Sequence, residues 1–224
     1  MSMVAIKDGM KGYLAKPAGG AGPAIVVIQE IFGVNAVMRG VADALAAAGY
    51  VALVPDLFWR LQPGVELSDK SEAEWKEALD LMGHFDIATG VEDIQASIDC
   101  LRAMPGVTKV GAVGYCLGGL MAFLAAARTN ADASVGYYGV NIPKFLGEAV
   151  KKPLMLHIAA QDGFVPKPMQ DIMIAGLKDN SLVTLHRYEG VDHAFARMGG
   201  KNWNAEAAAL ANGRTAEFFK AHLT

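Results

Sequence analysis

Short apolar runs alternate with longer segments of helical periodicity along most of the chain. Residues 24–28 (AIVVI) form a continuous apolar run rich in β-branched side chains, which is typical of a strand buried on both faces. Similar runs predict further strands at 50–55, 109–115, 133–139, 154–160 and 182–188, and an edge strand at 10–16. The segments between them predict helices at 36–48, 72–82, 87–103, 117–128, 166–177 and 203–222.

This alternation predicts an α/β fold with a mostly parallel sheet and helices on both faces. We expect a single domain over residues 1–224, with residues 57–87 as an insertion over one end of the sheet. Two helix starts carry capping signals: Asn35 precedes the first helix, and Ser71 with Glu74 has the spacing of a capping box. Ligand sites on such sheets lie at the carboxyl ends of the strands, so the residues that follow each strand are the candidates for chemistry.

Composition narrows the class of protein. The 224 residues are 53% hydrophobic and 19% charged with a net charge of −3, so we expect neither a nucleic-acid partner nor a membrane partner. The first ten residues lack the apolar core of a signal peptide, and no apolar run reaches about 18 residues. Two cysteines provide no disulfide framework, which favours a cytoplasmic protein. They also lie far from any histidines with ligand spacing, so we expect no metal.

One stretch, KVGAVGYCLGG at residues 109–119, carries the strongest chemical signal. It predicts a strand, a tight Gly-x-Cys-x-Gly turn and then a helix, which is the context of a nucleophile elbow with Cys116 at its centre. Gly114 and Gly118 provide the room that such a turn needs, because a Cβ at either position would crowd neighbouring backbone. The helix N-terminus that follows Cys116 favours a thiolate. The alternative is a buried cysteine that only packs beside a Gly-rich turn.

Two later residues complete a possible triad. Asp162 directly follows the predicted strand at 154–160, and His193 lies in the loop after the last predicted strand. The chain order Cys, Asp, His is that of α/β-hydrolases, in which the histidine takes the proton of the nucleophile and the acid orients the ring. Taken singly, Asp162 could be a helix cap and His193 a solvated loop residue. Asp192 is adjacent to His193 and is therefore poorly placed to reach its ring.

The remaining candidates surround this triad. An acyl intermediate needs backbone donors for its oxyanion, for which Leu117 and Ile31 have suitable positions after their strands. Glu30 could accept the S–H proton of the thiol and should move away once a thiolate forms, because the two anions repel. Its alternative role is an ion pair with Arg39 or Arg197. The planar guanidinium of Arg197 suits a carboxylate ligand, or it is an ordinary surface arginine.

These motifs resemble the dienelactone hydrolase family of α/β-hydrolases over nearly the whole chain. The segments that carry the resemblance are QEIFGVNAVMR (29–39), PDLF (55–58), F-D…G-V-x-D (85–93), GYCLGG (114–119), VGYYGV (135–140), QDGFVP (161–166) and HAFAR (193–197). The resemblance implies the α/β-hydrolase fold and a carboxylic-ester hydrolase of the carboxymethylenebutenolidase kind, which needs no cofactor.

The resemblance also implies roles for individual residues. It assigns the nucleophile, acid and base to Cys116, Asp162 and His193, and the oxyanion donors to Ile31 and Leu117. It implies that Glu30 holds the resting thiol and swings away on substrate binding, that Tyr137 lies near the nucleophile, and that Arg197 binds a substrate carboxylate. The implied partner is a small lactone or ester that carries a carboxylate, and we expect a monomer or weak dimer.

The chain departs from the family pattern on one wall of the implied substrate pocket. In the family, the helix that matches residues 72–82 contributes an arginine, a tyrosine and a tryptophan to the pocket. The corresponding positions here are Trp75, Leu79 and Met82, and Ala194 replaces the serine that follows the catalytic histidine. The pocket is thus expected to be more apolar and to favour a larger or less charged ester or lactone.

The leading hypothesis is a thiol hydrolase that opens a lactone or ester through a thioester. A glutaminase also uses a cysteine elbow, but that class has an acid two residues after its histidine, where this chain has Phe195. A non-catalytic ligand-binding or thiol-sensing protein on a hydrolase fold is the remaining alternative. It predicts a reactive Cys116 without turnover of any activated ester.

Overall fold

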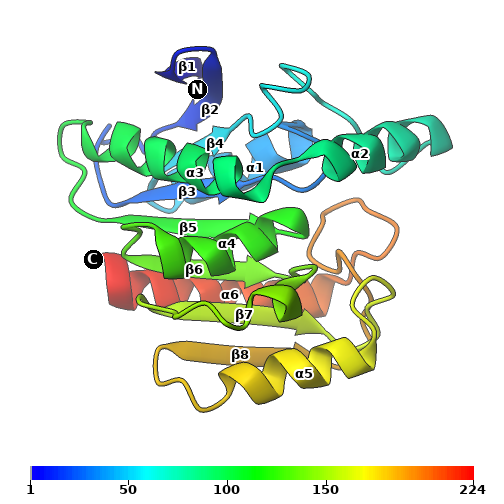
Figure 1. The fold of residues 1–224 in the computed structure, drawn as a ribbon. Coiled ribbons are helices and arrows are strands. Elements are labelled where there is room, and N and C mark those ends of the chain that lie inside the picture. Colours follow the sequence, from blue (N-terminus) through cyan, green and yellow to red (C-terminus); the bar gives the residue numbers. More distant parts are fainter. Residues whose placement is uncertain (1) are drawn as a thin grey trace.

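A twisted eight-stranded sheet lies between two layers of helices in the computed structural model, which describes residues 2–224 (Figure 1). The strands are β1 (Ser2–Lys7), β2 (Met10–Ala15), β3 (Ala24–Ile28), β4 (Val51–Pro55), β5 (Val110–Tyr115), β6 (Ala133–Tyr137), β7 (Leu154–Ala159) and β8 (Val183–Tyr188). The helices are α1 (Ala36–Ala47), α2 (Glu72–His84), α3 (Ile87–Arg102), α4 (Leu117–Arg128), α5 (Lys167–Leu177) and α6 (Ala205–Leu223), with a short 3₁₀ helix, η1 (Ile142–Phe145).

The sheet is parallel except at one edge. Its order is β1-β2-β4-β3-β5-β6-β7-β8, in which β1 and β2 are antiparallel and the pairs from β4 to β8 are parallel. This is the α/β-hydrolase fold that the sequence predicts. The predicted strands and helices agree with the observed ones to within two residues at each end.

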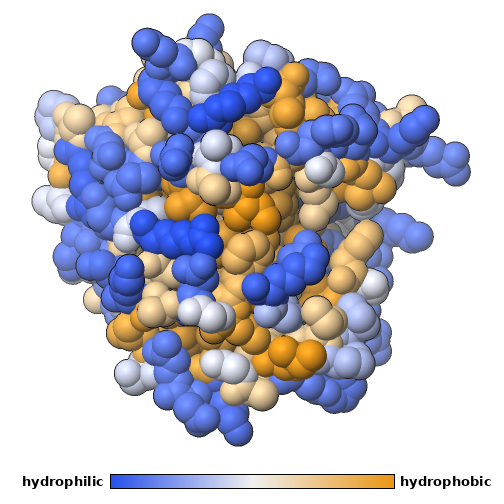
Figure 2. Space-filling model, viewed as in Figure 1, coloured by the Kyte–Doolittle hydropathy of each residue, from blue (hydrophilic) through white to orange (hydrophobic). Residues whose placement is uncertain are grey.

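Both faces of the sheet are buried, as the apolar runs predict. Alternate residues of β3 point to opposite sides, so that Ile25 and Val27 pack in one core cluster and Val26 and Ile28 in the other. Helices α1 and α6 cover the first face, and α3 and α4 cover the second (Figure 1). The outer surface of the layer that faces the viewer is mostly hydrophilic with apolar residues between, as expected of helices that turn their apolar sides inward (Figure 2).

The structure corrects the prediction of an edge strand at residues 10–16. Strand β2 lies between β1 and β4, and β1 forms the edge. The sequence analysis did not predict β1 (SMVAIK), although residues 3–6 are apolar, and its side chains are exposed or half-buried in the structure.

Helix caps fix the two helices nearest the carboxyl ends of the strands. The Asn35 side chain accepts a hydrogen bond from the Met38 N–H at 3.1 Å, as predicted. The Ser71 hydroxyl accepts one from the Glu74 N–H at 3.2 Å, but the Glu74 carboxylate binds the Ser68 and Ser71 hydroxyls, so the capping box is one-sided. Helix α2 and the loop from β8 to α6 lie at the same end of the sheet (Figure 1). No helix within residues 2–224 combines the length and apolar character that a membrane span requires.

Candidate active site

The turn between β5 and α4 has the strained geometry of a nucleophile elbow. Cys116 adopts φ 57° and ψ −112°, a backbone conformation that residues other than glycine rarely adopt. A Cβ on Gly114 would lie 1.9 Å from the Gly118 carbonyl oxygen, and a Cβ on Gly118 would lie 2.4 Å from that of Ile28. The prediction that both glycines make room for the turn is therefore confirmed. The Cys116 N–H donates to the Tyr137 carbonyl at 3.0 Å, which ties the turn to β6.

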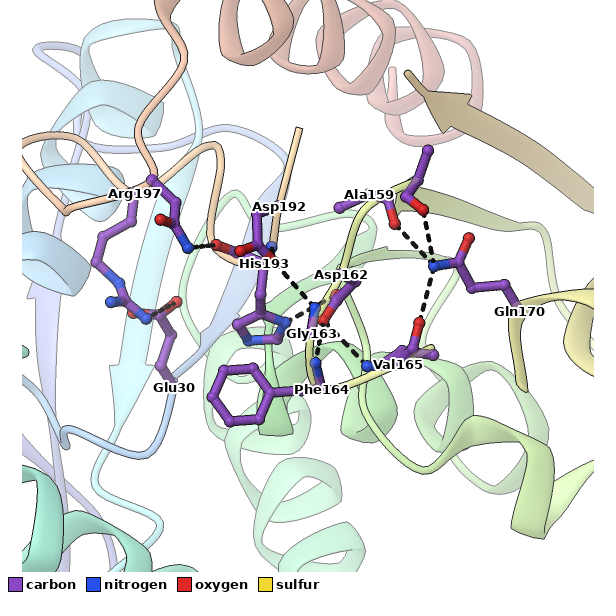
Figure 3. Close-up of polar contacts among 12 residues, drawn as sticks. Glu30, Ala159, Asp162, Gly163, Phe164, Val165, Gln170, Asp192, His193 and Arg197 are labelled. Atoms are coloured by element: carbon purple, nitrogen blue, oxygen red, sulfur yellow. Dashed lines mark hydrogen bonds and ion pairs between the residues drawn. The ribbon is translucent and has the colours of Figure 1, made fainter. Parts of the chain in front are cut away.

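Asp162 and His193 meet across the loops that follow β7 and β8. The Asp162 Oδ2 lies 2.9 Å from the His193 Nδ1, and both side chains are buried (Figure 3). The other carboxylate oxygen of Asp162 accepts hydrogen bonds from the Phe164 and Val165 N–H groups at 2.8 and 3.1 Å. With both oxygens engaged, the carboxylate is held in one orientation toward the ring. The sequence analysis expected the neighbouring Asp192 to be poorly placed for the ring, and Asp192 is indeed not its partner.

Asp192 instead joins the two loops through their backbones. Its Oδ1 accepts hydrogen bonds from the Gly163 N–H at 2.9 Å and from the His193 N–H at 2.6 Å (Figure 3). On the other side of Asp162, the buried Gln170 amide donates to the Ala159 and Val165 carbonyls. The sequence analysis found neither positioning role, because both depend on which backbone groups the folded loops turn inward.

Opposing effects act on the pKa of His193. Burial is the largest single effect and lowers this pKa. The negative charge that Cys116 would carry as a thiolate and the Asp162 carboxylate both raise it, and the net result is a pKa of about 10. The Nε2 atom is buried and has no hydrogen-bond partner in the described part of the chain. Such an unpartnered polar atom in a pocket marks a place where a reacting group can bind. The site therefore favours a protonated His193 ring.

Two backbone N–H groups lack an acceptor among the described residues. Leu117 is the first residue of α4, so its N–H has no acceptor within the helix. Ile31 lies in the turn after β3, and no hydrogen bond from its N–H occurs among the described residues. Both residues are buried. These are the two donors that the sequence analysis selects.

Cys116 faces a pocket of about 350 Å³ at the carboxyl ends of the strands. Residues from six separate parts of the chain line it: Ile31, Phe32, Trp75, Leu79, Met82, Cys116, Val140, Phe164, His193 and Arg197. The structure thus brings the three α2 positions selected from the sequence to the same pocket as the cysteine and histidine. Among residues 2–224, no group of three or more His, Cys, Asp or Glu side chains is arranged to hold a metal.

Aromatic rings form a continuous wall along this pocket. Phe32 and Trp75 meet edge to face with their ring centroids 5.0 Å apart, and Trp75 stacks on Phe164 at 6.3 Å. Phe164 in turn meets the His193 ring at 4.8 Å. Phe164 is 58% exposed and therefore stands at the rim. Its part in the wall was not predicted, although it lies within the QDGFVP motif.

Glu30 binds Arg197 and not the thiol. Its two carboxylate oxygens accept hydrogen bonds from the Arg197 Nε and Nη2 at 2.7 and 3.0 Å (Figure 3). The Nη1 atom of Arg197 donates to the Asp69 carboxylate at 2.8 Å. Among the described residues, no hydrogen bond joins Glu30 to Cys116. Of the alternatives for Glu30, the structure therefore contains the ion pair with Arg197.

Tyr137 does not reach the pocket. It is the last residue of β6, is fully buried, and its hydroxyl bonds to the Asn212 and Thr215 side chains of α6. The next residue, Tyr138, has φ 38° and meets the His193 ring edge to face at 5.0 Å. The tyrosine beside the His193 ring is thus Tyr138, because successive residues at the strand end turn to opposite sides of the sheet.

Comparisons with known proteins identify relatives of this chain. The sequence model of the Dienelactone hydrolase family matches residues 10–223. A protein of Azospirillum brasilense is 48% identical over 100% of this chain and 98% of its own length. A carboxymethylenebutenolidase of Pseudomonas putida is 44% identical over 92% of this chain and 88% of its own. The crystal structure of a Klebsiella pneumoniae protein superposes with a TM-score of 0.82 at 26% identity, and covers 94% of this chain and 92% of that one.

Proposed function

Because the chain belongs to the dienelactone hydrolase family and is a hydrolase of esters or lactones, we propose that it acts through Cys116, His193 and Asp162 and through a thioester intermediate. One observation carries the proposal. The elbow cysteine opens into the same pocket as His193, whose far nitrogen is held by Asp162 at 2.9 Å. This arrangement supports roles for the three residues as nucleophile, base and orienting acid in covalent acyl transfer.

In the first half of the reaction, the Cys116 thiolate attacks the carbonyl carbon of the bound ester or lactone. The Ile31 and Leu117 N–H groups stabilise the oxyanion that forms. When the C–O bond breaks, the protonated His193 ring donates its Nε2 proton to the departing oxygen. A thioester, a free alcohol or enol and a neutral ring result, and in a lactone the new hydroxyl stays attached to the acyl chain.

In the second half, neutral His193 takes a proton from a water molecule, whose oxygen attacks the thioester carbonyl. The C–S bond breaks, the thiolate returns, and the carboxylic acid leaves. Asp162 holds the ring in one orientation through both halves, since its carboxylate is itself fixed by two backbone N–H groups. Glu30 orients Arg197 in this scheme and takes no proton.

Replacement of the sulfur tests the proposal. The Cys116→Ala variant should fold, because the residue is a small buried side chain, and should lose turnover of p-nitrophenyl acetate and of a dienelactone. A matched control is Cys100→Ala, which removes the other cysteine of the chain and should keep wild-type rates. Retained activity in Cys116→Ala would refute the mechanism.

A further inference from the structure

We propose that Gln29 is a positioning residue of this site: its side-chain amide holds the peptide between Glu30 and Ile31 in the orientation that aims the Ile31 N–H at the oxyanion. The inference rests on the proposed function, because Ile31 is one of the two donors in that mechanism. Gln29 begins the QEIF segment, yet the proposed mechanism gives it no part.

The orientation of this peptide depends on more than its neighbours along the chain. Strand β3 holds the chain before it, up to Ile28, and the Phe32 carbonyl after it accepts the Leu67 N–H at 2.9 Å. A peptide plane between two anchored points can still turn over, since the ψ and φ angles that flank it are soft and can change together. The Ile31 N–H has no acceptor among the described residues, so it does not hold the plane itself.

The carbonyl side of this peptide is the side that is held. The Gln29 Nε2 atom lies 3.3 Å from the Glu30 carbonyl oxygen, and among residues 2–224 it is the one group that donates to that oxygen. The peptide bond is trans, so its C=O and N–H bonds point in opposite directions in one plane. An anchor on the carbonyl therefore also fixes the direction of the Ile31 N–H, and Ile31 lines the pocket together with Cys116.

A second contact decides which way round the Gln29 amide lies. Its Oε1 atom accepts the Leu57 N–H, at 3.0 Å, from the loop that follows β4. Only the oxygen of an amide can accept from an N–H group, so the NH2 group is left for the Glu30 carbonyl. The loop is itself held by Asp56, whose carboxylate accepts two backbone N–H groups. A chain of hydrogen bonds thus runs from the end of the neighbouring strand to the peptide of the oxyanion donor.

Gln29 acts through this peptide and does not touch the substrate. It is fully buried and is not among the residues that line the pocket. Without its amide, the Glu30 carbonyl would be buried and unpaired, which is costly in the protein interior. Turning the peptide over would relieve that cost, because the carbonyl would then reach water in the pocket. The same turn would remove the Ile31 N–H and put a dipole of the wrong sign at the oxyanion position.

The Gln29→Met variant of the full chain tests this role, because methionine is unbranched and of similar length but cannot donate to the carbonyl. With p-nitrophenyl butanoate, kcat should fall at least about tenfold and at most about 10³-fold, the upper value for removal of one oxyanion donor. Propyl trifluoromethyl ketone should lose affinity by a similar factor, because the Cys116 sulfur adds to its carbonyl carbon and leaves an oxyanion. The corresponding secondary alcohol, which forms no adduct, should bind as it does to the wild type.

Ser97→Ala is the matched control. The Ser97 hydroxyl is also buried and donates to one backbone carbonyl, that of Asp93 in α3, and neither residue lines the pocket. This exchange should lower the free energy of unfolding but leave kcat and the ratio of ketone to alcohol affinity unchanged. Wild-type kcat in Gln29→Met, equal losses of kcat in both variants, or equal weakening of ketone and alcohol would overturn the inference.

A measurement on the wild-type protein keeps the inference testable where Gln29→Met does not fold. In protein labelled with 15N at isoleucine and glutamine, the Ile31 amide proton should shift downfield when the ketone adduct forms. The Gln29 side-chain protons should exchange slowly with D2O before and after the ketone is added, because that contact is already made in the free protein. An unshifted Ile31 amide, or Gln29 protons that exchange as fast as those of the exposed Gln161, would overturn the inference.

Cys116→Ala, assayed beside these variants, separates the inference from the proposed function. Turnover that depends on Cys116 but not on Gln29 would overturn the positioning role alone. Turnover that survives in Cys116→Ala would refute the proposed function and the inference with it.

Discussion

The Asp162→Asn exchange perturbs the proposed mechanism at one defined contact. It replaces the carboxylate that faces the His193 Nδ1 at 2.9 Å by a neutral amide of nearly the same shape. The Phe164 and Val165 N–H groups can still donate to the amide oxygen, so the loop should keep its conformation. What changes is the charge that helps to keep the His193 ring protonated.

The size of the effect follows from the distance and the burial. Two unit charges about 4 Å apart in an effective dielectric near 20 interact by about 4 kcal/mol, and one pKa unit corresponds to about 1.4 kcal/mol. Removal of the Asp162 charge should therefore lower the pKa of His193 from about 10 by roughly one to three units. Loss of the oriented carboxylate should also reduce kcat/KM by up to about 10⁴-fold, the effect of the same exchange on kcat in a serine protease triad.

The assay is the pH profile of kcat/KM for a p-nitrophenyl ester, corrected for spontaneous hydrolysis. In the wild type we expect no loss of activity near pH 6.5, since the raised pKa keeps His193 protonated there, and a loss as the pH approaches about 10. In Asp162→Asn this alkaline loss should move to lower pH. Asp192→Asn is the control, because Asp192 accepts from backbone N–H groups and not from the ring. An unmoved profile in Asp162→Asn, or equal shifts in both variants, would refute the reasoning.

Three further predictions concern stability and follow from local packing. Gly114→Ala should destabilise the fold by more than about 3 kcal/mol in urea unfolding, because its Cβ would overlap the Gly118 carbonyl. Gly147→Ala, with nothing within 4 Å of its Cβ, should change the stability little, and equal effects of the two exchanges would contradict the elbow geometry. Gly213→Ala, in the middle of α6 with nothing within 4 Å of its Cβ, should stabilise the protein by about 0.5–1 kcal/mol, and a loss of stability would count against this reading. Burial, with a smaller effect of nearby positive charge, lowers the pKa of His157 to about 3, so the neutral ring stabilises the fold above pH 6.5 and this contribution is lost as the pH falls toward 3. The advantage of the wild type over His157→Gln in unfolding free energy should therefore shrink between pH 7 and 4, and a constant difference would argue against it.

The sequence predicts most of the architecture because buried parallel strands consist of unbroken apolar runs. Strand β3 occurs at the predicted residues, and α4 begins and ends as expected directly after the elbow. Strand β1 was missed although residues 3–6 are apolar; it pairs with β2 while its side chains stay exposed or half-buried. Order along the chain also places the candidate triad, because each member follows a strand whose carboxyl end lies at one edge of the sheet.

Contacts between distant loops account for what the sequence could not reveal. Asp69 lies in an irregular segment 128 positions from Arg197, and no spacing rule relates the two. Yet this acid accepts the Nη1 hydrogen bond of the arginine. Tyr137 and Tyr138 illustrate the same limit at short range, because the end of β6 determines which hydroxyl turns toward α6 and which ring turns toward His193. Such details depend on loop conformation and strand ends, which residue patterns do not specify.

The most direct test of the central claim is to trap the acyl-enzyme. The wild-type protein is mixed with a p-nitrophenyl ester, quenched in acid within milliseconds and analysed by mass spectrometry of the intact chain and of its peptides. The account predicts one acyl group on the peptide that contains Cys116, labile to hydroxylamine and absent from Cys116→Ala. Turnover without any adduct on Cys116, or an adduct on another residue, would contradict it.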